Sequence, residues 1–129
     1  MAEKKHAKVK RFHVRGKDRE YFTSNLTLLL KAAVPVGEAL QSLQETSRSK
    51  MLNKALQQMQ ADIEEGTSLA RALQRSGIVS VQTLALVQLG EQSGNLVENL
   101  RVASKQETKQ RIFRTKVRSA LLYPLFVLS

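Results

Sequence analysis

The sequence predicts an all-α fold: a six-helix bundle of three antiparallel helical hairpins, with the last helix running toward a membrane segment. Three observations lead to this prediction. Apolar residues recur at helical spacing, the apolar side chains are mainly aliphatic with only 5% aromatic residues, and glycines and capping residues interrupt the pattern at intervals. The 129 residues suit one compact domain, and a hydrophobic content of 42% is enough for a core.

The first hairpin is expected on either side of Pro35. Asp18 fits the N-cap of the first helix. The apolar face of this helix would be formed by Phe22, Leu26, Leu29 and Ala33. Pro35 fits the first turn of the second helix, because its fixed φ suits that position and its missing N–H is not needed there. The apolar face of the second helix would be formed by Val36, Ala39, Leu40 and Leu43.

The second hairpin follows a polar run at residues 45–49. The apolar face of the third helix would be formed by Leu52, Leu56, Met59 and Ile63. Gly66 ends this helix, and Thr67 or Ser68 can cap a short fourth helix. The apolar residues of the fourth helix would be Leu69, Ala72 and Leu73. Gly77 then ends it.

The third hairpin joins a fifth helix, over about residues 80–92, to the last helix. The apolar residues of the fifth helix cover a broad arc, which predicts deep burial at the centre of the bundle. Gly94 ends that helix, and Asn95 with Glu98 three residues later forms a capping-box-like start for the sixth. The sixth helix would pack through Leu96, Leu100 and Ala103. Beyond Ser104 its apolar residues thin out to Ile112, Phe113 and Val117.

The net charge of +10 lies at the two ends of the chain. Residues 1–20 contribute +5 and residues 101–118 contribute +6, whereas residues 21–100 contribute −1. Residues 1–17 are basic and poor in apolar side chains, so we expect them to be disordered, and the bundle domain then spans residues 18–118. The cations nearest the end of the last helix are Lys105, Lys109, Arg111, Arg114, Lys116 and Arg118.

The segment after these cations is apolar. Residues 120–128 are nine uncharged residues, which measure about 14 Å as a helix against a hydrocarbon core of about 30 Å. We therefore expect residues 119–129 to be the truncated start of a transmembrane helix. Cations that flank such a helix favour the cytoplasmic side, so we expect the bundle there. No signal-peptide pattern opens the chain.

Catalytic chemistry has few candidates in this sequence. Cysteine is absent, which excludes disulfides, thiolate zinc sites and cysteine nucleophiles, and both histidines, His6 and His13, precede the expected bundle. The segment from Gly90 to Gly94 lacks the pattern of a phosphate loop and contains Glu91, so helix termination is favoured. We predict no catalytic, cofactor-binding or metal site, no cofactor, and a protein that is not an enzyme.

Two alternatives stay open. The acidic residues Glu64, Glu65, Glu91 and Glu98 allow a carboxylate cation site, with surface ion pairs and helix caps as the default. The basic last helix allows a nucleic-acid-binding domain, since its cations can neutralise phosphates. These cations are scattered around the helix, lack interleaved aromatic residues and lie beside an apolar segment, so we favour lipid head groups over nucleic acid.

Four segments of the chain together resemble one family. They are residues 22–36 around Pro35, Gly66-Thr67-Ser68-Leu69-Ala70-Arg71-Ala72-Leu73, Gly90-Glu91-Gln92-Ser93-Gly94-Asn95-Leu96, and residues 116–124. In their order and spacing they are similar to the F-domain of type II secretion system platform proteins, a family that includes type IV pilus and competence-system counterparts. The residues that carry the structural motifs are Pro35, Gly66, Gly90, Glu91 and Gly94. Ala33 stands where the family usually has Gly, and residues 77–81 lack its usual Phe-Pro.

The resemblance implies a structural role within a larger protein. Such proteins lie in the bacterial inner membrane and connect the cytoplasmic assembly ATPase to the growing pilus or pseudopilus. The implied partners are that ATPase, other inner-membrane assembly components, pilin-like subunits and the anionic membrane surface, with a homodimer possible and nucleic acid disfavoured. Because the family usually continues through the membrane into a second, similar domain, we expect this chain to be a natural fragment or an excised domain.

Overall fold

The computed structural model describes the backbone of residues 11–128 and the side chains of residues 11–118. Within this range the chain forms helices and connecting turns, with no strand. The helices are α2 (Gly16–Lys31), α3 (Val36–Thr46), α4 (Lys50–Glu64), α5 (Leu69–Ser76), α6 (Val81–Ser93) and α7 (Leu96–Leu128). The all-α fold of six helices is therefore confirmed.

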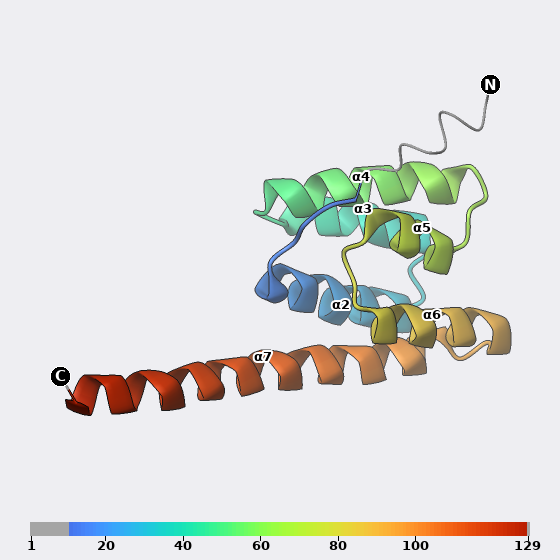
Figure 1. The fold of residues 1–129 in the computed structure, drawn as a ribbon. Coiled ribbons are helices and arrows are strands. Elements are labelled where there is room, and N and C mark those ends of the chain that lie inside the picture. The colour runs from blue at the N-terminus through green and yellow to red at the C-terminus, as the bar shows by residue number, and fades with distance from the viewer. Residues whose placement is uncertain (1–10, 129) are drawn as a thin grey trace, which may run out of the picture.

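The other five helices form a bundle on one side of the long α7 (Figure 1). α2 and α6 both lie along α7, and α3 packs along α4 on the opposite side of the bundle, with α5 between α4 and α6. Helices that follow one another in the sequence are in contact, as the predicted hairpins require. The bundle is closed by the pairing of α2 with α7, the first and last helices of the described chain.

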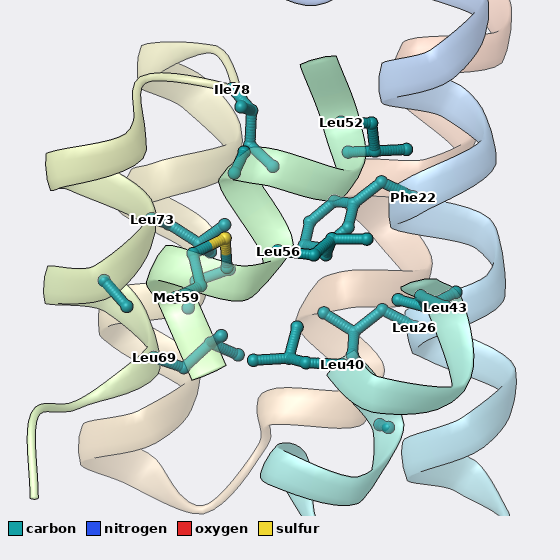
Figure 2. Close-up of a cluster of buried hydrophobic side chains, with 14 of the residues drawn as sticks. Phe22, Leu26, Leu40, Leu43, Leu52, Leu56, Met59, Leu69, Leu73 and Ile78 are labelled. Atoms are coloured by element: carbon teal, nitrogen blue, oxygen red, sulfur yellow. The ribbon is translucent and has the colours of Figure 1, made fainter. Parts of the chain in front are cut away.

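The core is formed mainly by α2, α3, α4 and α5, together with the turn after α5 (Figure 2). The side chains that meet there are Phe22, Leu26, Leu40, Leu43, Leu52, Leu56, Met59, Leu69, Leu73 and Ile78. Each fully buried side chain of this kind stabilises the fold by about 1.5–3 kcal/mol relative to exposure. Most residues of the predicted apolar faces of the first four helices therefore point into one common core. Ala33 does not, because α2 ends at Lys31 and Ala33 is exposed in the turn that follows.

The predicted place of the fifth helix at the centre of the bundle is wrong. α6 buries only Thr83, Val87 and Gly90, whereas Val81 is 80% exposed and Leu89 is 59% exposed. α6 packs against α7 and α5, so only the part of its apolar arc that faces them is covered. The width of the apolar arc can be read from the sequence, but the number of helices that pack against that arc cannot.

The bundle begins earlier in the chain than residue 18. The N–H of Phe12 donates to the carbonyl of Ser76 at 2.8 Å, and Val14 is buried in the core. α2 starts at Gly16, after the extended residue Arg15. Residues 11–15, which the sequence places in a disordered segment, therefore pack against the end of α5, and residues 1–10 lie outside the described part of the chain.

α7 extends well beyond the other helices (Figure 1). Its last residues packed against α2 and α6 are near Thr108, and every residue from 111 to 118 is exposed. The backbone stays helical to Leu128. Over the residues that the structure describes, no helix has both the length and the apolar character needed to cross a membrane.

Candidate functional site

Two of the sequence motifs meet at the start of α5. The carboxylate of Glu91, on α6, accepts a hydrogen bond from the N–H of Leu69 at 3.0 Å and another from the N–H of Ala70 at 2.9 Å. The hydroxyl oxygen of Ser68 accepts from the N–H of Arg71 at 3.1 Å. The first three N–H groups of α5 are therefore all satisfied by side chains. We call Ser68, Leu69, Ala70 and Glu91 the Glu91 junction.

The Glu91 junction suits the short length of α5, which has eight residues. A helix of this length gains little from its own hydrogen bonds, so its stability depends on caps and packing. A carboxylate at a helix N-terminus also interacts favourably with the partial positive charge of the unpaired N–H groups. Glu91 thus holds α5 to α6 across 22 residues of sequence.

Gly90 and Gly94 set the position of Glu91. A Cβ atom on Gly90 would lie 2.7 Å from the Cα of Leu96, so a side chain there would push the start of α7 away. Gly94 has φ +78°, and the N–H groups of Gly94 and Asn95 both donate to the carbonyl of Gly90. The corner between α6 and α7 is therefore tight, and both glycines are needed for its shape.

The remaining motif residues lie in other turns. Gly66 follows the end of α4 with φ +93°, just before the Glu91 junction. Pro35 precedes the first residue of α3 and its carbonyl accepts from the N–H of Ala39 at 2.8 Å. The α2–α3 turn also holds Ala33 at φ +67°, a left-handed conformation that a non-glycine residue rarely adopts.

A surface groove lies beside the Glu91 junction, between α5 and α6. It has a volume of about 520 Å³. Its lining residues are Ser68, Ala70, Arg71, Gln74, Gln88, Glu91 and Gln92. These side chains are mostly polar and present both hydrogen-bond donors and acceptors.

The four acidic residues considered for a cation site do not come together. Both oxygens of Glu91 accept from backbone N–H groups, while Glu98 bonds to Arg101 at 2.6 and 3.1 Å. That hydrogen bond, together with the charge of Arg101, lowers the pKa of Glu98. Glu64 and Glu65 lie at the end of α4. Across the described residues, no group of three or more His, Cys, Asp or Glu side chains is placed to hold a metal ion.

The contacts of Glu98 also differ from the predicted capping box. In that motif the side chain three residues after the cap reaches back to the cap residue, Asn95. Glu98 instead bonds forward to Arg101, one turn later on α7. An arginine at this spacing competes with the backbone for the carboxylate, which the local pattern of Asn and Glu does not reveal.

The six basic residues predicted near the membrane are all exposed on α7. These residues are Lys105, Lys109, Arg111, Arg114, Lys116 and Arg118. Arg111 forms an ion pair with Glu20 on α2, and Glu20 also accepts from the hydroxyl of Thr108 at 3.2 Å. The others are distributed around the helix, so the charge surrounds α7.

Sequence reasoning missed a polar contact between α6 and α7. Glu107 is only 6% exposed, and its carboxylate accepts a hydrogen bond from the hydroxyl of Thr83 at 3.2 Å. Burial raises the pKa of Glu107, although the positive charge of Arg19 and the Thr83 hydrogen bond act in the opposite direction. The signal was present, because the buried residues Leu100 and Ala103 lead at helical spacing to position 107.

A second polar contact lies between α2 and α7. The hydroxyl groups of Ser24 and Ser104 are 2.8 Å apart and share a hydrogen bond. This hydrogen bond and the contacts of Glu20 with α7 explain why few apolar residues occur beyond Ser104 although α7 still packs against α2. Polar side chains replace apolar ones along this part of the interface.

Comparison with known proteins identifies the family. The family model described as "Type II secretion system (T2SS), protein F" matches residues 22–129. The chain belongs to the type II secretion system protein F family. The matched range includes the Glu91 junction and the corner between Gly90 and Gly94. Membership of the protein F family does not favour a nucleic-acid-binding domain.

Individual relatives in the protein F family have names that describe assembly, secretion or transport. The chain is 35% identical over 112 residues to the type IV pilus assembly protein PilC of Thermus thermophilus. It is 33% identical over 95 residues to the type II secretion system protein F of Pseudomonas aeruginosa, and 28% identical over 106 residues to a protein transport protein HofC homolog of Haemophilus influenzae. The matches cover 86%, 73% and 81% of this chain but only 27%, 24% and 26% of those relatives, respectively.

Proposed function

We propose that this chain is part of a non-catalytic inner-membrane platform component of a type II secretion or type IV pilus assembly system. In this role it scaffolds the assembly ATPase, other inner-membrane assembly components and pilin-like subunits through protein–protein contacts. The observation that carries the proposal is the match of the type II secretion system protein F model to residues 22–129. The Glu91 junction, where both carboxylate oxygens of Glu91 bind the backbone of α5, fits the non-catalytic part of the proposal. A carboxylate held in this way supports the shape of the domain and is not placed to transfer a proton to a substrate.

The proposed arrangement places the helical domain, residues 11–118, on the cytoplasmic side and residues 119–129 at the start of a membrane helix. Two features support it. The exposed cations of α7 come immediately before a stretch without charges, and the helix continues through both without a break. In this arrangement the cations of α7 lie near the membrane surface, where they can interact with anionic lipid head groups.

The groove between α5 and α6 supports the scaffolding role. It is open, it is lined mostly by polar side chains, and all of its lining residues lie within the range that the family model matches. The groove is lined from two helices, by Arg71 and Gln74 on α5 and by Gln88 on α6. Binding of a partner there would therefore depend on the relative position of α5 and α6. We propose this groove as a contact for an assembly component, and the same domain is open to homodimer formation.

The proposal is tested with the complete protein that contains this chain, expressed in its own host. Cell fractionation should recover the protein with the inner membrane, and deletion of its gene should abolish secretion or piliation. A photocrosslinking residue at Gln88 should give adducts with assembly components. The same residue at Lys54, which is exposed in the middle of α4, serves as a comparison position.

Two results would contradict the proposal. One is recovery of the complete protein in the soluble fraction. The other is a deletion strain with unchanged secretion and piliation. Either result removes the platform role, whichever residues form adducts.

A further inference from the structure

A group of cations surrounds the end of the bundle from which α7 departs. Arg15 precedes α2, Lys17 lies in its first turn, Arg48 lies between α3 and α4, and Arg111 lies on α7. All four are exposed. They come from separate parts of the sequence, and the fold brings them to one end. We call these four residues the basic end.

Three neighbouring cavities connect the members of the basic end. One of about 290 Å³ is lined by Lys17 and Arg48, and one of about 350 Å³ by Arg15, Lys17 and Arg48. A third, of about 400 Å³, is lined by Lys17 and Arg111. Because Lys17 lines all three cavities, the basic end is a continuous surface that runs from the α3–α4 connection to α7.

The basic end keeps an excess of positive charge after its acidic neighbours are counted. The acids that line the same cavities are Asp18 and Glu20. Glu20 is paired with Arg111. Among the residues that the structure describes, no acid forms an ion pair with Arg15, Lys17 or Arg48. Three cations therefore face a single remaining acid, Asp18, which gives a surface that attracts phosphate.

The direction of α7 indicates where such phosphates would be. The N-terminal end of α2 and the start of α4 lie at the end of the bundle toward which α7 projects (Figure 1). The projecting part of α7 carries the exposed cations Arg114, Lys116 and Arg118, followed by residues 119–128 without charge. The basic end and the projecting helix thus face the same region.

We propose that the basic end faces an anionic membrane surface and is held close to it by electrostatic attraction to lipid phosphates. The inference rests on the proposed membrane placement of α7. With residue 119 at the hydrocarbon boundary, Arg111 lies about 12 Å from it along the helix. A head-group layer of about 6 Å leaves a gap smaller than the screening length of about 8 Å at physiological salt, so the attraction acts across it.

The test compares two triple variants of the 129-residue chain. The first is Arg15→Gln, Lys17→Gln, Arg48→Gln. The matched control is Lys31→Gln, Lys54→Gln, Arg71→Gln, which removes the same charge from exposed positions outside the basic end. Binding is measured by flotation with vesicles of phosphatidylcholine and with vesicles of phosphatidylcholine and phosphatidylglycerol in equal parts. The difference between the two vesicles isolates the electrostatic part of binding from insertion of the apolar segment.

The basic-end variant should lose anionic-vesicle binding by on the order of 100-fold, since each cation near the surface contributes about fivefold. The control variant should bind the anionic vesicles about fivefold more weakly than the wild type, or less than that. Added salt should reduce the preference of the wild type for the anionic vesicles. Circular dichroism checks that both variants keep their helices. Binding to the neutral vesicles should be the same for all three proteins.

The inference is overturned if the two variants lose the same amount of binding to the anionic vesicles, because binding would then depend only on the total charge of the chain. It is also overturned if the basic-end variant binds the anionic vesicles as the wild type does. A basic-end variant that loses binding to duplex DNA while keeping binding to anionic vesicles would assign this surface to nucleic acid. None of these results bears on membrane recovery of the complete protein, which tests the proposed function separately.

Discussion

Single side chains fix the geometry of this domain at points where two helices meet. Glu91 joins α6 to the start of α5, and Gly90 allows the closest approach of α6 to α7. Neither residue contributes much to the apolar core. These two residues favour one relative position of the helices, which packing of the apolar core alone would define less narrowly.

Replacing Glu91 by Ala should lower the free energy of unfolding by about 1–2 kcal/mol. The change leaves two N–H groups of α5 without acceptors, and because Glu91 itself is exposed, water can enter its place and offset part of the loss. Urea unfolding of the two proteins measures the difference. Glu98→Ala is the control, because Glu98 forms an exposed pair with Arg101 and its loss should leave stability almost unchanged. Equal losses in both variants would show that Glu91 acts only as a surface charge.

Replacing Ala33 by Gly should raise the free energy of unfolding by about 1 kcal/mol. Ala33 has φ +67°, where a Cβ atom is strained and glycine is not. The neighbouring exposed residue Ala32 has φ −80°, so Ala32→Gly should lower stability by a few tenths of a kcal/mol up to about 1 kcal/mol. Thermal unfolding distinguishes the two, and stabilisation by both variants would contradict the role of the backbone angle.

At the scale of the helix, α6 shows that apolar composition and burial are separate properties. Its predicted extent of about 80–92 agrees with the observed Val81–Ser93, and Gly94 does end it in a left-handed conformation. Its apolar arc, however, is wider than the surface that α5 and α7 cover. Val81, Ala85 and Leu89 recur every four residues and form an exposed stripe along the helix.

The two sides of α6 should respond differently to the same substitution. Val87→Ala removes buried methyl groups and should lower the free energy of unfolding by about 1–3 kcal/mol. Val81→Ala removes the same groups from a side chain that is 80% exposed, so stability should change by less than about 0.5 kcal/mol. Chemical denaturation of the isolated chain measures both. A large loss in the Val81 variant would mean that this stripe is covered in solution.

The limits of sequence reasoning follow from the range of the interactions. Helix positions, the ends at Gly77 and Gly94, and the core faces depend on residues within a few positions of one another, so local spacing predicts them. The hydrogen bonds of Glu91 to α5 and the contact of Glu107 with Thr83 join residues more than 20 positions apart. Nothing in the spacing of a single helix indicates which distant backbone group a carboxylate will meet, and the pairing of α2 with α7 was missed for the same reason.

At the scale of the whole molecule, α7 is the element that other helices share. It contacts α2 through Ser104 and Thr108, and α6 through Glu107 and Asn99, whose side chain donates to the carbonyl of Leu86 at 2.9 Å. Arg19, on α2, acts on Glu107 through its charge. Three helices therefore meet around one buried carboxylate.

The effect of Glu107 on stability should depend on pH. Burial raises its pKa in the folded protein, so in the pH range between the ordinary and the raised pKa the folded chain keeps a proton that the unfolded chain has lost. The contribution of Glu107 to stability is therefore greatest below its ordinary pKa and falls as the pH rises through the raised value. Glu107→Gln removes this dependence while its amide oxygen can still accept from Thr83.

Urea unfolding of Glu107→Gln and wild type at acidic and neutral pH tests this expectation. Relative to wild type, the variant should gain stability as the pH rises from about 4 to 7. Glu64→Gln, an exposed position at the end of α4, is the control and should show no such gain. A difference between Glu107→Gln and wild type that stays constant with pH would contradict the raised pKa.

The continuity of α7 has a mechanical consequence. Its 33 residues span about 50 Å, and no Gly or Pro occurs from residue 96 to residue 123 to provide a hinge. α2 and α6 pack only against the part of α7 up to about Thr108, so the helix can act as a lever whose short arm lies in the bundle. A small rotation of the bundle becomes a larger sideways displacement at the far end, and a load applied at either end is transmitted to the other.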